Sequence, residues 1–383
     1  MASSKELGIR RLHAVHFYVN SLDRMRRFWV EQLDFAFIAA STEAQVEQWA
    51  GRTEVYQANQ VTYLMTEAAG TRGLAHGWLK RHPDGVGELI FEVDDVNQTF
   101  AVLESRGAAI VNDVETWERN GGSWRAFSIT TAFGDTRFTF VQQSGFVDAA
   151  PQVTTFDSPK GGTNRFGIGH IDHVTSNFLS LAPLVLWCKN ILGLEEYWGI
   201  EFHTKDHATV QTHTGSGLRS TVLWDPHSGV KFANNEPLRP YFDKSQIYTF
   251  VDDNFGPGVQ HTAVTIADIV GTVDAMRKAG LEFMPTPGTY YDALPARLAE
   301  SDIEIEEEMD VLRANQILVD GEGPGKYMLQ IFAKDFAALF GDKNGGPFFL
   351  EIIQRKGDRG FGGGNFRALF ESIEREQVAK GRI

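Results

Sequence analysis

Hydrophobic and polar positions follow the same order in two stretches of the chain. Residues 12–39 and residues 171–199 each begin with a short alternating run and continue into a helical pattern. Each then closes on a Leu-Asp-Phe or Leu-Gly-Leu turn and enters another alternating run. A period of two predicts a half-buried strand, and a period near 3.6 predicts a helix. Both stretches are therefore predicted to form a strand, a helix and a strand.

A second pair of stretches repeats in the same way. Residues 85–111 and residues 258–284 each show a strand pattern, a turn that contains Asp, a helix pattern and another strand pattern. Each helix meets a glycine, Gly107 or Gly280, where glycine is the expected helix stop. We therefore predict an internal duplication, in which each half is a pair of strand–helix–strand–strand–strand modules.

The two halves are predicted to be two domains. Each half ends its core in an apolar run that reaches a glutamine, at residues 137–143 and at residues 348–355. Between the halves, residues 148–164 are polar and rich in Pro and Gly, which is typical of a linker. These boundaries give an N-terminal domain over residues 1–152 and a C-terminal domain over residues 165–383.

The C-terminal domain carries an additional predicted helix. It begins at Asn365, and its apolar residues follow the spacing i, i+3, i+4 and i+7: Phe366, Leu369, Phe370 and Ile373. One face of this helix is therefore expected to pack against the domain. The preceding glycine-rich segment, residues 360–365, resembles a dinucleotide loop only superficially, because no further strand or ribose-binding acid follows it. We interpret it as a hinge for the tail helix.

Composition narrows the class of protein. With 42% apolar and 22% charged residues, the 383-residue chain is expected to be a soluble globular protein. Its 36 Lys and Arg against 50 Asp and Glu give a net charge of −14, which disfavours nucleic acid as a partner. No signal peptide and no run of roughly 20 apolar residues is apparent, so no membrane association and a cytoplasmic location are predicted. The single cysteine, Cys188, excludes a disulfide framework, and its apolar surroundings predict a buried thiol.

Aligning the two halves isolates three positions at which only the second half carries side chains that bind metals. They are His173 opposite Ala14, His261 opposite Glu88, and Glu351 opposite Thr139. Two histidines and one carboxylate on one face of a metal leave its other positions open, as in non-heme iron(II) oxygenases. Because these residues are far apart in sequence, their convergence depends entirely on the fold.

Each of these residues also has an ordinary interpretation. A single histidine is more often a structural or surface residue than a ligand, and Glu351 could occupy an outward-facing strand position. Against this, a carboxylate inside the run FFLEII is costly to bury without a partner. A structural or solvated role is expected for the remaining histidines that the sequence brings to attention: His13, His16, His170, His203, His207 and His213.

The second half resembles the 4-hydroxyphenylpyruvate dioxygenases over essentially its whole length. The motifs that carry the resemblance are GHIDHV from Gly169, NEP from Asn235, GVQH from Gly258, PTPGTYYDAL from Pro285, LQIF from Leu329, and the long tail PFFLEIIQRKGDRGFGGGNFRALFESIEREQ from Pro347. The resemblance implies a vicinal oxygen chelate fold of class α+β, in which duplicated βαβββ modules form two open barrels and the tail helix is a lid.

The resemblance also implies a ligand set and a substrate pocket. Iron(II) would be bound by His173, His261 and Glu351. The pocket residues implied by the family are Ser220, Asn235 and Gln246 near the phenol end of the substrate, Gln260 and Gln330 near the iron, and Phe332, Phe349, Phe361, Asn365 and Phe366 along the wall and lid. Taken singly, Ser220 and Gln246 could be ordinary polar strand residues, and Phe332 and Phe349 could be ordinary core.

The implied activity is the conversion of 4-hydroxyphenylpyruvate and O2 to homogentisate and CO2, in tyrosine catabolism. The rival reaction is that of 4-hydroxymandelate synthase, whose LQIF phenylalanine tends to be a smaller aliphatic residue. Phe332 therefore favours homogentisate. The sequence departs from the family motifs at Arg219, Ala233, Asn234 and Thr262. The change at Ala233 and Asn234 alters polarity near the ring and leaves a related 2-oxo acid as an alternative substrate. A non-catalytic binding protein for aromatic ligands is the alternative from another class, and a homo-oligomer, dimer or tetramer, is expected.

Overall fold

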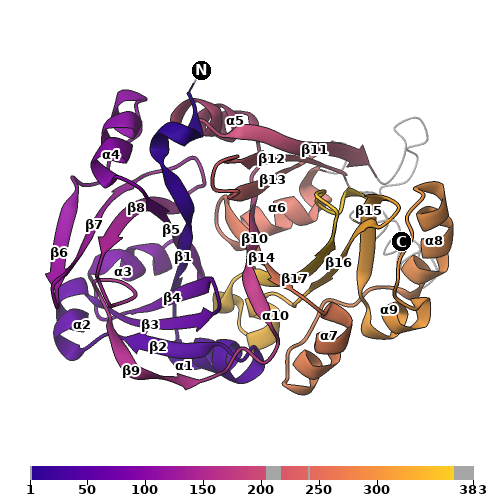
Figure 1. Ribbon diagram of the computed structural model, residues 1–383, viewed down its shortest axis with the longest axis horizontal. Coiled ribbons are helices and arrows are strands. Elements are labelled where there is room, and N and C mark those ends of the chain that lie inside the picture. Colours follow the sequence, from indigo (N-terminus) through magenta and orange to yellow (C-terminus); the bar gives the residue numbers. More distant parts are fainter. Residues whose placement is uncertain (1, 204–216, 240–241, 366–383) are drawn as a thin grey trace.

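A computed structural model describes residues 2–203, 217–239 and 242–365 of the chain. The two halves lie side by side, with the first half at the indigo end of the colour scale and the second half at the orange and yellow end (Figure 1). Each half is built on one curled sheet, flanked by short helices. The segment that follows Asn365, including Phe366 and the predicted tail helix, lies outside the described residues.

The first half contains nine strands and four α-helices among its described residues. After a 3₁₀ turn at Ser4–Leu7, the elements are β1 (Ile9–Val19), α1 (Leu22–Arg26), β2 (Ala36–Ala40), α2 (Glu43–Trp49), β3 (Gly51–Ala58), β4 (Val61–Ala68), α3 (Gly73–Leu79), β5 (Gly85–Val93), α4 (Val96–Ser105), β6 (Glu115–Arg119), β7 (Gly122–Ile129), β8 (Arg137–Ser144) and β9 (Thr154–Gly161).

The second half repeats this order with longer insertions. Its described elements are β10 (Ile168–Asn177), α5 (Ala182–Trp187), β11 (Glu195–His203), β12 (Gly217–Trp224), β13 (Lys231–Pro237), α6 (Gln246–Asp253), β14 (Gly258–Ile266), α7 (Ile269–Lys278), α8 (Gly288–Glu300), α9 (Met309–Asn315), β15 (Leu318–Gly323), β16 (Lys326–Phe332), α10 (Phe336–Phe340) and β17 (Phe349–Lys356), with 3₁₀ turns at Phe242–Lys244 and Lys343–Gly345.

The strand order of the two sheets confirms the duplication. The first sheet runs β6-β7-β8-β5-β1-β4-β3-β2-β9, and the second runs β15-β16-β17-β14-β10-β13-β12-β11 when read from the equivalent edge. Each sheet therefore combines two βαβββ modules that meet at a central antiparallel pair, β1 with β5 or β10 with β14. The predicted α+β class and the paired modules are confirmed.

Local chemistry is also duplicated. The predicted Asp turns are helix N-caps, because Asp95 accepts hydrogen bonds from the backbone at the start of α4 and Asp268 does so at the start of α7. The chain then leaves each helix through a glycine in the left-handed region, with φ of 82° at Gly107 and 95° at Gly280. These caps explain why the two helices begin and end at equivalent residues.

The segment between the halves is not entirely a linker. Residues Thr154–Gly161 form β9, which pairs antiparallel with β2 at the edge of the first sheet. The linker predicted for residues 148–164 therefore contains a strand, because an exposed edge strand can be built from polar residues that bury little of their surface. The two domain boundaries themselves stay a prediction.

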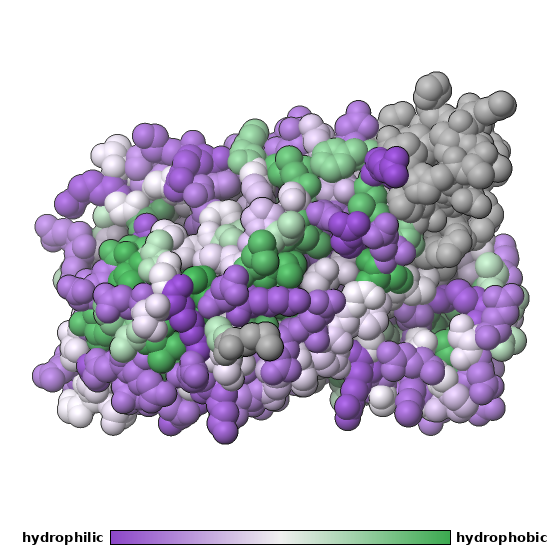
Figure 2. All heavy atoms as spheres, turned by 90° about the horizontal axis from the view of Figure 1, so that it is seen from above, coloured by the Kyte–Doolittle hydropathy of each residue, from purple (hydrophilic) through white to green (hydrophobic). Residues whose placement is uncertain are grey.

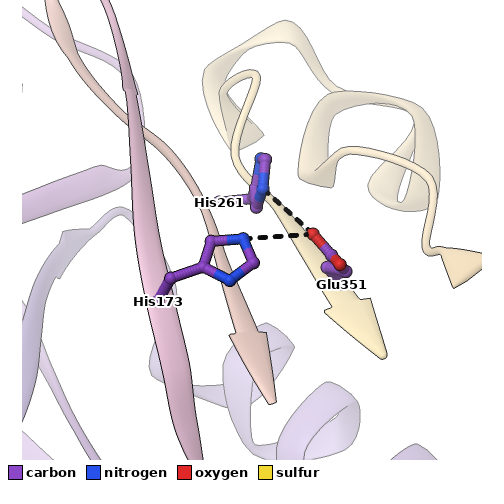
Figure 3. A group of neighbouring side chains, drawn as sticks. All are labelled: His173, His261 and Glu351. Atoms are coloured by element: carbon purple, nitrogen blue, oxygen red, sulfur yellow. Dashed lines mark ion pairs between the residues drawn. The ribbon is translucent and has the colours of Figure 1, made fainter. Parts of the chain in front are cut away.

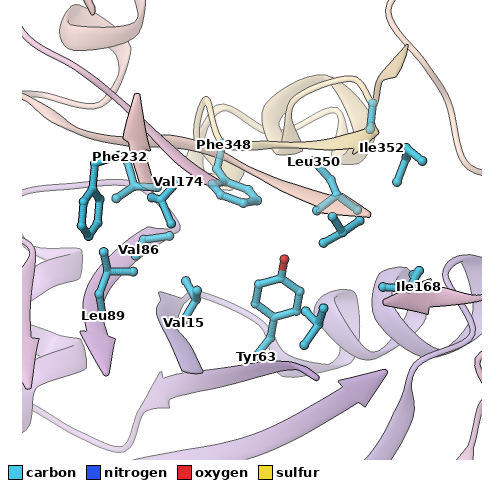
Figure 4. Close-up of a cluster of buried hydrophobic side chains, with 14 of the residues drawn as sticks. Val15, Tyr63, Val86, Leu89, Ile168, Val174, Phe232, Phe348, Leu350 and Ile352 are labelled. Atoms are coloured by element: carbon cyan, nitrogen blue, oxygen red, sulfur yellow. The ribbon is translucent and has the colours of Figure 1, made fainter. Parts of the chain in front are cut away.

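One hydrophobic core spans both halves. Side chains from β1, β4 and β5 meet side chains from β10, β13 and β17 between the two sheets (Figure 4). The ring centroids of Phe17 and Phe348 lie 4.7 Å apart in a T-shaped contact. The hydroxyl groups of Tyr63 and Thr262, both fully buried, share a hydrogen bond of 2.8 Å across the same boundary. The halves are therefore packed as one body.

The alternation along β1 and β10 separates this core from the interior of each curled sheet. Val15 and Val174 belong to the shared core, while their neighbours in sequence point to the opposite face. Cys188 is also in the core, as predicted, and burial raises the pKa of its thiol. On the outer surface seen in Figure 2, hydrophobic side chains gather only in small groups among hydrophilic ones. Among the described helices, none is long and apolar enough to cross a membrane.

Candidate metal centre

Three neighbouring strands of the second sheet bring two histidines and a glutamate together. His173 lies on β10, His261 on β14 and Glu351 on β17, and the three side chains point toward one another (Figure 3). The Nε2 atoms of His173 and His261 lie 3.4 and 3.2 Å from Oε2 of Glu351. All three residues are buried. Among the described residues, this is the one cluster of three or more His, Cys, Asp or Glu with metal-binding geometry.

The sheet register supports the alignment of the halves. In the second sheet, His261 is opposite Thr175 and Ala263 is opposite Glu351. The same pairs recur in the first sheet, where Glu88 is opposite His16 and Ile90 is opposite Thr139. Thr139 is therefore the structural counterpart of Glu351, and Glu88 that of His261.

Each imidazole is oriented by an acceptor at its other nitrogen. Nδ1 of His173 lies 2.8 Å from Oδ1 of Asp172, and Nδ1 of His261 lies 3.2 Å from Oε1 of Gln260. Both acceptors fix the proton on Nδ1, so that each Nε2 offers its lone pair to the centre. Asp172 is itself held by Arg355, whose Nε and Nη2 donate to its two oxygens at 2.7 Å. The sequence analysis missed Asp172 and Arg355, although Asp172 directly precedes His173.

A buried carboxylate such as Glu351 is stabilised by positive charge or by hydrogen-bond donors beside it. Burial alone would raise the pKa of Glu351, but the two imidazoles outweigh burial and lower it to about 2. Burial also lowers the pKa of His261, whereas at His173 the nearby carboxylates of Glu351 and Asp172 outweigh burial and raise the pKa. A divalent cation among the two Nε2 atoms and the carboxylate would supply that charge with both imidazoles neutral. The donor set therefore fits a metal ion.

A small cavity adjoins the cluster. It has a volume of about 90 Å³, and His261 forms part of its wall. Seven of the residues predicted for the substrate pocket or the catalytic set line it: Asn235, Gln246, Gln260, Gln330, Phe332, Phe349 and Asn365. Five further residues that the sequence analysis did not single out complete the lining: Leu218, Ile247, Met284, Leu318 and Gly362. The cavity is thus mainly apolar, with a few amide groups.

Aromatic rings surround the ligand cluster on two sides. Phe349 stacks on the ring of His261 with centroids 4.6 Å apart, and Phe332 meets Phe349 at 89° with centroids 6.0 Å apart. Phe361 does not line the cavity. It packs edge-on against the ring of His173, the other histidine of the cluster, with centroids 5.0 Å apart. The three phenylalanines therefore shield the metal ligands from water.

A chain of hydrogen bonds connects Glu351 to the region where the described chain ends. Gln330 donates from Nε2 to Oε1 of Glu351, and Asn365 donates from Nδ2 to Oε1 of Gln330, both at 2.8 Å. The hydroxyl group of Tyr290 donates to Oδ1 of Asn365 at 2.7 Å, and Arg297 donates to that hydroxyl. Tyr290 lies in the motif PTPGTYYDAL, but its spacing alone gave no sign of this contact.

The remaining predicted pocket residues are placed differently. Ser220 is buried on β12, opposite Asn235 in the register, but it does not line the cavity. Asn235 donates to Oδ1 of Asn177 at 3.0 Å. Gln246 is the exposed first residue of α6 and lies at the edge of the cavity. The structure therefore brings together most of this set, whereas Ser220 lies beside Asn235 on the neighbouring strand and outside the cavity lining.

The four departures from the family motifs have local explanations. Arg219 forms ion pairs with Glu201 and Glu236 at 2.9 and 2.6 Å, and Asn234 donates to backbone carbonyls of β12 and β13. Thr262 bonds Tyr63 across the two halves, and Ala233 packs against Phe361. None of the four lines the cavity, so these departures leave its described wall unchanged.

Two of the histidines assigned a structural role have clear partners. His16 is buried between Glu88 and Thr66, with both contacts at 2.7 Å. His170 is exposed, and its Nδ1 lies 3.1 Å from Oγ1 of Thr265. His203 ends β11, whereas His207 and His213 lie outside the described residues.

Comparison with known proteins agrees with this fold and site. A family model for the glyoxalase/bleomycin resistance protein/dioxygenase superfamily matches residues 11–134 and 170–295, which together exceed half of the chain. The duplicated modules and the buried His–His–Glu cluster thus belong to a member of this metal-dependent superfamily.

Curated relatives define the family more closely. A 4-hydroxyphenylpyruvate dioxygenase from Caenorhabditis briggsae is 37% identical over 80% of this chain and 76% of the relative. One from Dictyostelium discoideum is 32% identical over 96% of this chain and 98% of the relative. Among solved structures, a triple mutant of 4-hydroxymandelate synthase from Streptomyces coelicolor matches with a TM-score of 0.78 and 26% identity, over 97% of this chain and 99% of that one. The chain belongs to the 4-hydroxyphenylpyruvate dioxygenase family of enzymes.

Proposed function

We propose that this enzyme converts 4-hydroxyphenylpyruvate and O2 to homogentisate and CO2, with iron(II) bound by His173, His261 and Glu351. The observation that carries the proposal is the buried His–His–Glu cluster beside an apolar cavity, in a chain of this family. Imidazole and carboxylate ligands without thiolate suit iron(II), and three ligands leave coordination positions open. Bound iron would supply chelation of the 2-oxo acid and activation of O2.

The contribution of the protein is to hold the aryl group and to exclude water. Phe332 and Phe349 form two perpendicular aromatic faces beside His261, against which a substrate ring can pack. The amides of Asn235 and Gln246 can hydrogen-bond a phenol at the other part of the cavity wall. Gln330 keeps Glu351 in place through its amide donor. Excluding water protects a reactive oxidant from side reactions.

The decisive experiment is aerobic turnover by the purified, iron-loaded protein. We expect 4-hydroxyphenylpyruvate to drive O2 uptake with equal amounts of CO2 and homogentisate, and Glu351→Ala to abolish the uptake. Glu282→Gln is a matched control, because Glu282 is an exposed carboxylate paired with Lys334. Uptake no faster than that of Glu351→Ala would contradict the proposal and favour a binding protein or a related 2-oxo acid, which a panel of aryl and alkyl keto acids would then identify.

The structural match to 4-hydroxymandelate synthase supports a second candidate reaction, hydroxylation of the benzylic carbon. Phe332 distinguishes the two, because a bulky ring beside His261 restricts how the substrate ring approaches the metal. We expect wild-type enzyme to give homogentisate, and Phe332→Leu to shift part of the product to 4-hydroxymandelate. Chromatography of the products separates the two acids, and mandelate from the wild-type enzyme would select the second reaction.

A further inference from the structure

The first half contains a larger cavity of its own. It lies inside the curl of the first sheet, has a volume of about 320 Å³, and includes on its wall Glu88 and Thr139, the counterparts of two metal ligands. The cavity thus occupies, in the first half, the place that the metal centre occupies in the second. None of the residues predicted from the sequence for the metal site or the substrate pocket lines this cavity.

The floor of this cavity is formed by Glu88, His16, Thr139 and Thr66. It differs from the metal centre because its ionisable groups already have hydrogen-bond partners. Oε2 of Glu88 lies 2.7 Å from Nδ1 of His16, and its Oε1 accepts a hydrogen bond from Thr139. Nε2 of His16 lies 2.7 Å from Oγ1 of Thr66, which also bonds Thr53. Both nitrogens of the imidazole and both oxygens of the carboxylate are used. This floor therefore lacks the imidazole nitrogens without a hydrogen-bond partner that face the carboxylate in the metal centre.

Two hydrogen-bond donors beside this floor have no acceptor among the described residues. The hydroxyl group of Tyr18 is buried, in a residue only 4% exposed, and makes no hydrogen bond. Burial and the nearby charge of Glu88 raise the pKa of Tyr18, so the phenol keeps its proton. Arg137 is half-buried and lines the cavity, and its guanidinium forms no hydrogen bond or close ion pair with a described side chain, although its charge interacts at longer range with Glu88. A buried donor without an acceptor is costly, which indicates that a ligand can complete it.

Gly87 makes the position of Tyr18 possible. A Cβ atom at Gly87 would lie 2.2 Å from the Tyr18 ring, so any other residue there would displace the phenol. The counterpart of Gly87 in the second half is Gln260, which orients His261. At this position the second half therefore has a side chain that orients a metal ligand. The first half has a glycine, which leaves room for the ring of Tyr18 on the cavity wall.

Part of the remaining wall is aromatic, and the rest consists of small, aliphatic and polar side chains. Trp49 and Trp117 approach with centroids 5.8 Å apart, and Trp124 and Phe127 line the same space. The exposed Glu115 is also on the wall, but it faces solvent and can move away from a bound anion. Aromatic walls favour a planar apolar group, and the unpaired guanidinium with a phenol donor favours a carboxylate.

We propose that the cavity of the first half is a second binding site, for a small aromatic carboxylate. Arg137 would pair with the carboxylate of the ligand, Tyr18 would donate a hydrogen bond to it, and the tryptophans would pack against its ring. The site requires no metal ion and is separate from the metal centre. It does not depend on the proposed reaction, since any planar aryl acid of suitable size meets its chemistry.

Calorimetric titration of the iron-loaded, full-length enzyme with 3-phenylpropionate tests the proposal. This probe lacks the keto oxygen needed to chelate a metal through two atoms. We expect saturable binding that weakens about tenfold in Arg137→Gln and in Tyr18→Phe, since a hydrogen bond with a charged group is lost in the first and a donor is lost in the second. The uncharged 3-phenylpropanol should bind more weakly than the acid to the wild type, and equally to the wild type and Arg137→Gln.

Matched variants separate this site from the metal cavity and from general damage. Arg125→Gln changes an arginine on the adjacent strand β7 that bonds Asn97, and should leave probe binding unchanged. Circular dichroism checks the folding of each variant, and Tyr18→Phe remains informative if Arg137→Gln is unstable. The proposal is overturned if the probe does not bind, or if its affinity is the same in Arg137→Gln, Tyr18→Phe and the wild type. Because turnover is not measured, this outcome is independent of the proposed reaction.

Discussion

The two halves of this enzyme follow the same path and differ in what their sheets enclose. At three equivalent positions the second half carries His173, His261 and Glu351, and the first half carries Ala14, Glu88 and Thr139. In the second half the buried carboxylate meets two imidazoles that are free to bind a metal. In the first half the carboxylate is satisfied by one imidazole and a hydroxyl.

This difference shows that the backbone alone does not create the metal centre. In each half, the curled sheet brings three strand positions close together. The side chains at these positions then determine whether the group can bind a metal ion or forms only internal hydrogen bonds. The orienting residues differ as well, since Asp172 and Gln260 hold the imidazoles of the second half.

The largest effect should come from removing one ligand. His261→Ala should lower kcat/KM by at least about a thousandfold, because loss of the bound metal removes several kcal/mol of stabilisation and each 1.4 kcal/mol is tenfold. Iron content by atomic absorption should fall in parallel. His170→Ala is the matched control, an exposed imidazole on the same sheet that bonds only Thr265. Full iron content in His261→Ala would show that the cluster is not the metal site.

The next effect should come from the residue that orients a ligand. Asp172→Asn keeps the shape of the side chain but removes the charge that faces His173 and Arg355. Iron affinity should fall about 10–100-fold, as measured by competition with a chelator. Asp274→Asn, at an exposed carboxylate paired with Lys278, should leave it unchanged. Equal affinities in Asp172→Asn and the wild type would mean that the imidazole needs no charged support.

A smaller effect, on the free energy of unfolding, tests whether the two halves unfold together. Tyr63→Phe leaves the hydroxyl group of Thr262 buried without a partner and should lower the free energy of unfolding by about 2 kcal/mol. Adding Thr262→Val should recover most of this loss, because replacing both partners is nearly neutral. Urea denaturation should show one transition in all forms. Two separate transitions in the wild type would contradict the shared core.

The smallest expected effect is on the pH dependence of stability. It compares one carboxyl group in each half, Glu92 in the first and Asp358 in the second. His13 and Arg11 lower the pKa of Glu92 to about 2, so its contribution to stability is present above its ordinary pKa and is lost as the pH falls toward 2. Burial raises the pKa of Asp358 to about 6, so its neutral form is favoured in the folded state and stability is lost as the pH rises from about 4 to 6.

The corresponding variants should therefore respond in opposite directions at neutral pH. At pH 7.5, Glu92→Gln should lower the free energy of unfolding by about 1 kcal/mol, after allowance for solvent screening, and Asp358→Asn should raise it. At pH 3, below the pKa of Asp358 in both the folded and the unfolded state, the gain from Asp358→Asn should vanish. Urea titrations at the two pH values measure both, and a gain from Asp358→Asn that does not depend on pH would contradict the assignment.

Much of the fold could be predicted from local patterns. The periodicity, the Asp caps and the glycine stops occur within single stretches of sequence, and they placed the modules and their helices. The strand β9 was missed, because an edge strand on a solvated face needs no apolar alternation. The tail helix is a prediction that lies outside the described residues.

The candidate site was predictable only in part. Comparison of the halves identified His173, His261 and Glu351 by their type, and the family motifs added most of the cavity wall. Asp172 and Tyr290 were missed, since a carboxylate or a phenol in a sequence does not reveal which distant group it will contact. Ser220 was assigned to the pocket from its motif, but it lies beside Asn235 on β12 and does not line the cavity.

By itself, the sequence determined that this protein is a duplicated α+β chain, and which residues are chemically able to bind a metal. Only the tertiary structure decided that those residues meet and that the two sheets share one core. It also decided that the carboxylate of Glu88 in the first half is hydrogen-bonded by His16 and Thr139. The physical reason is the distance along the sequence over which each kind of interaction acts. Periodicity and capping act over a few residues, whereas a ligand cluster depends on the register of strands that are distant in sequence.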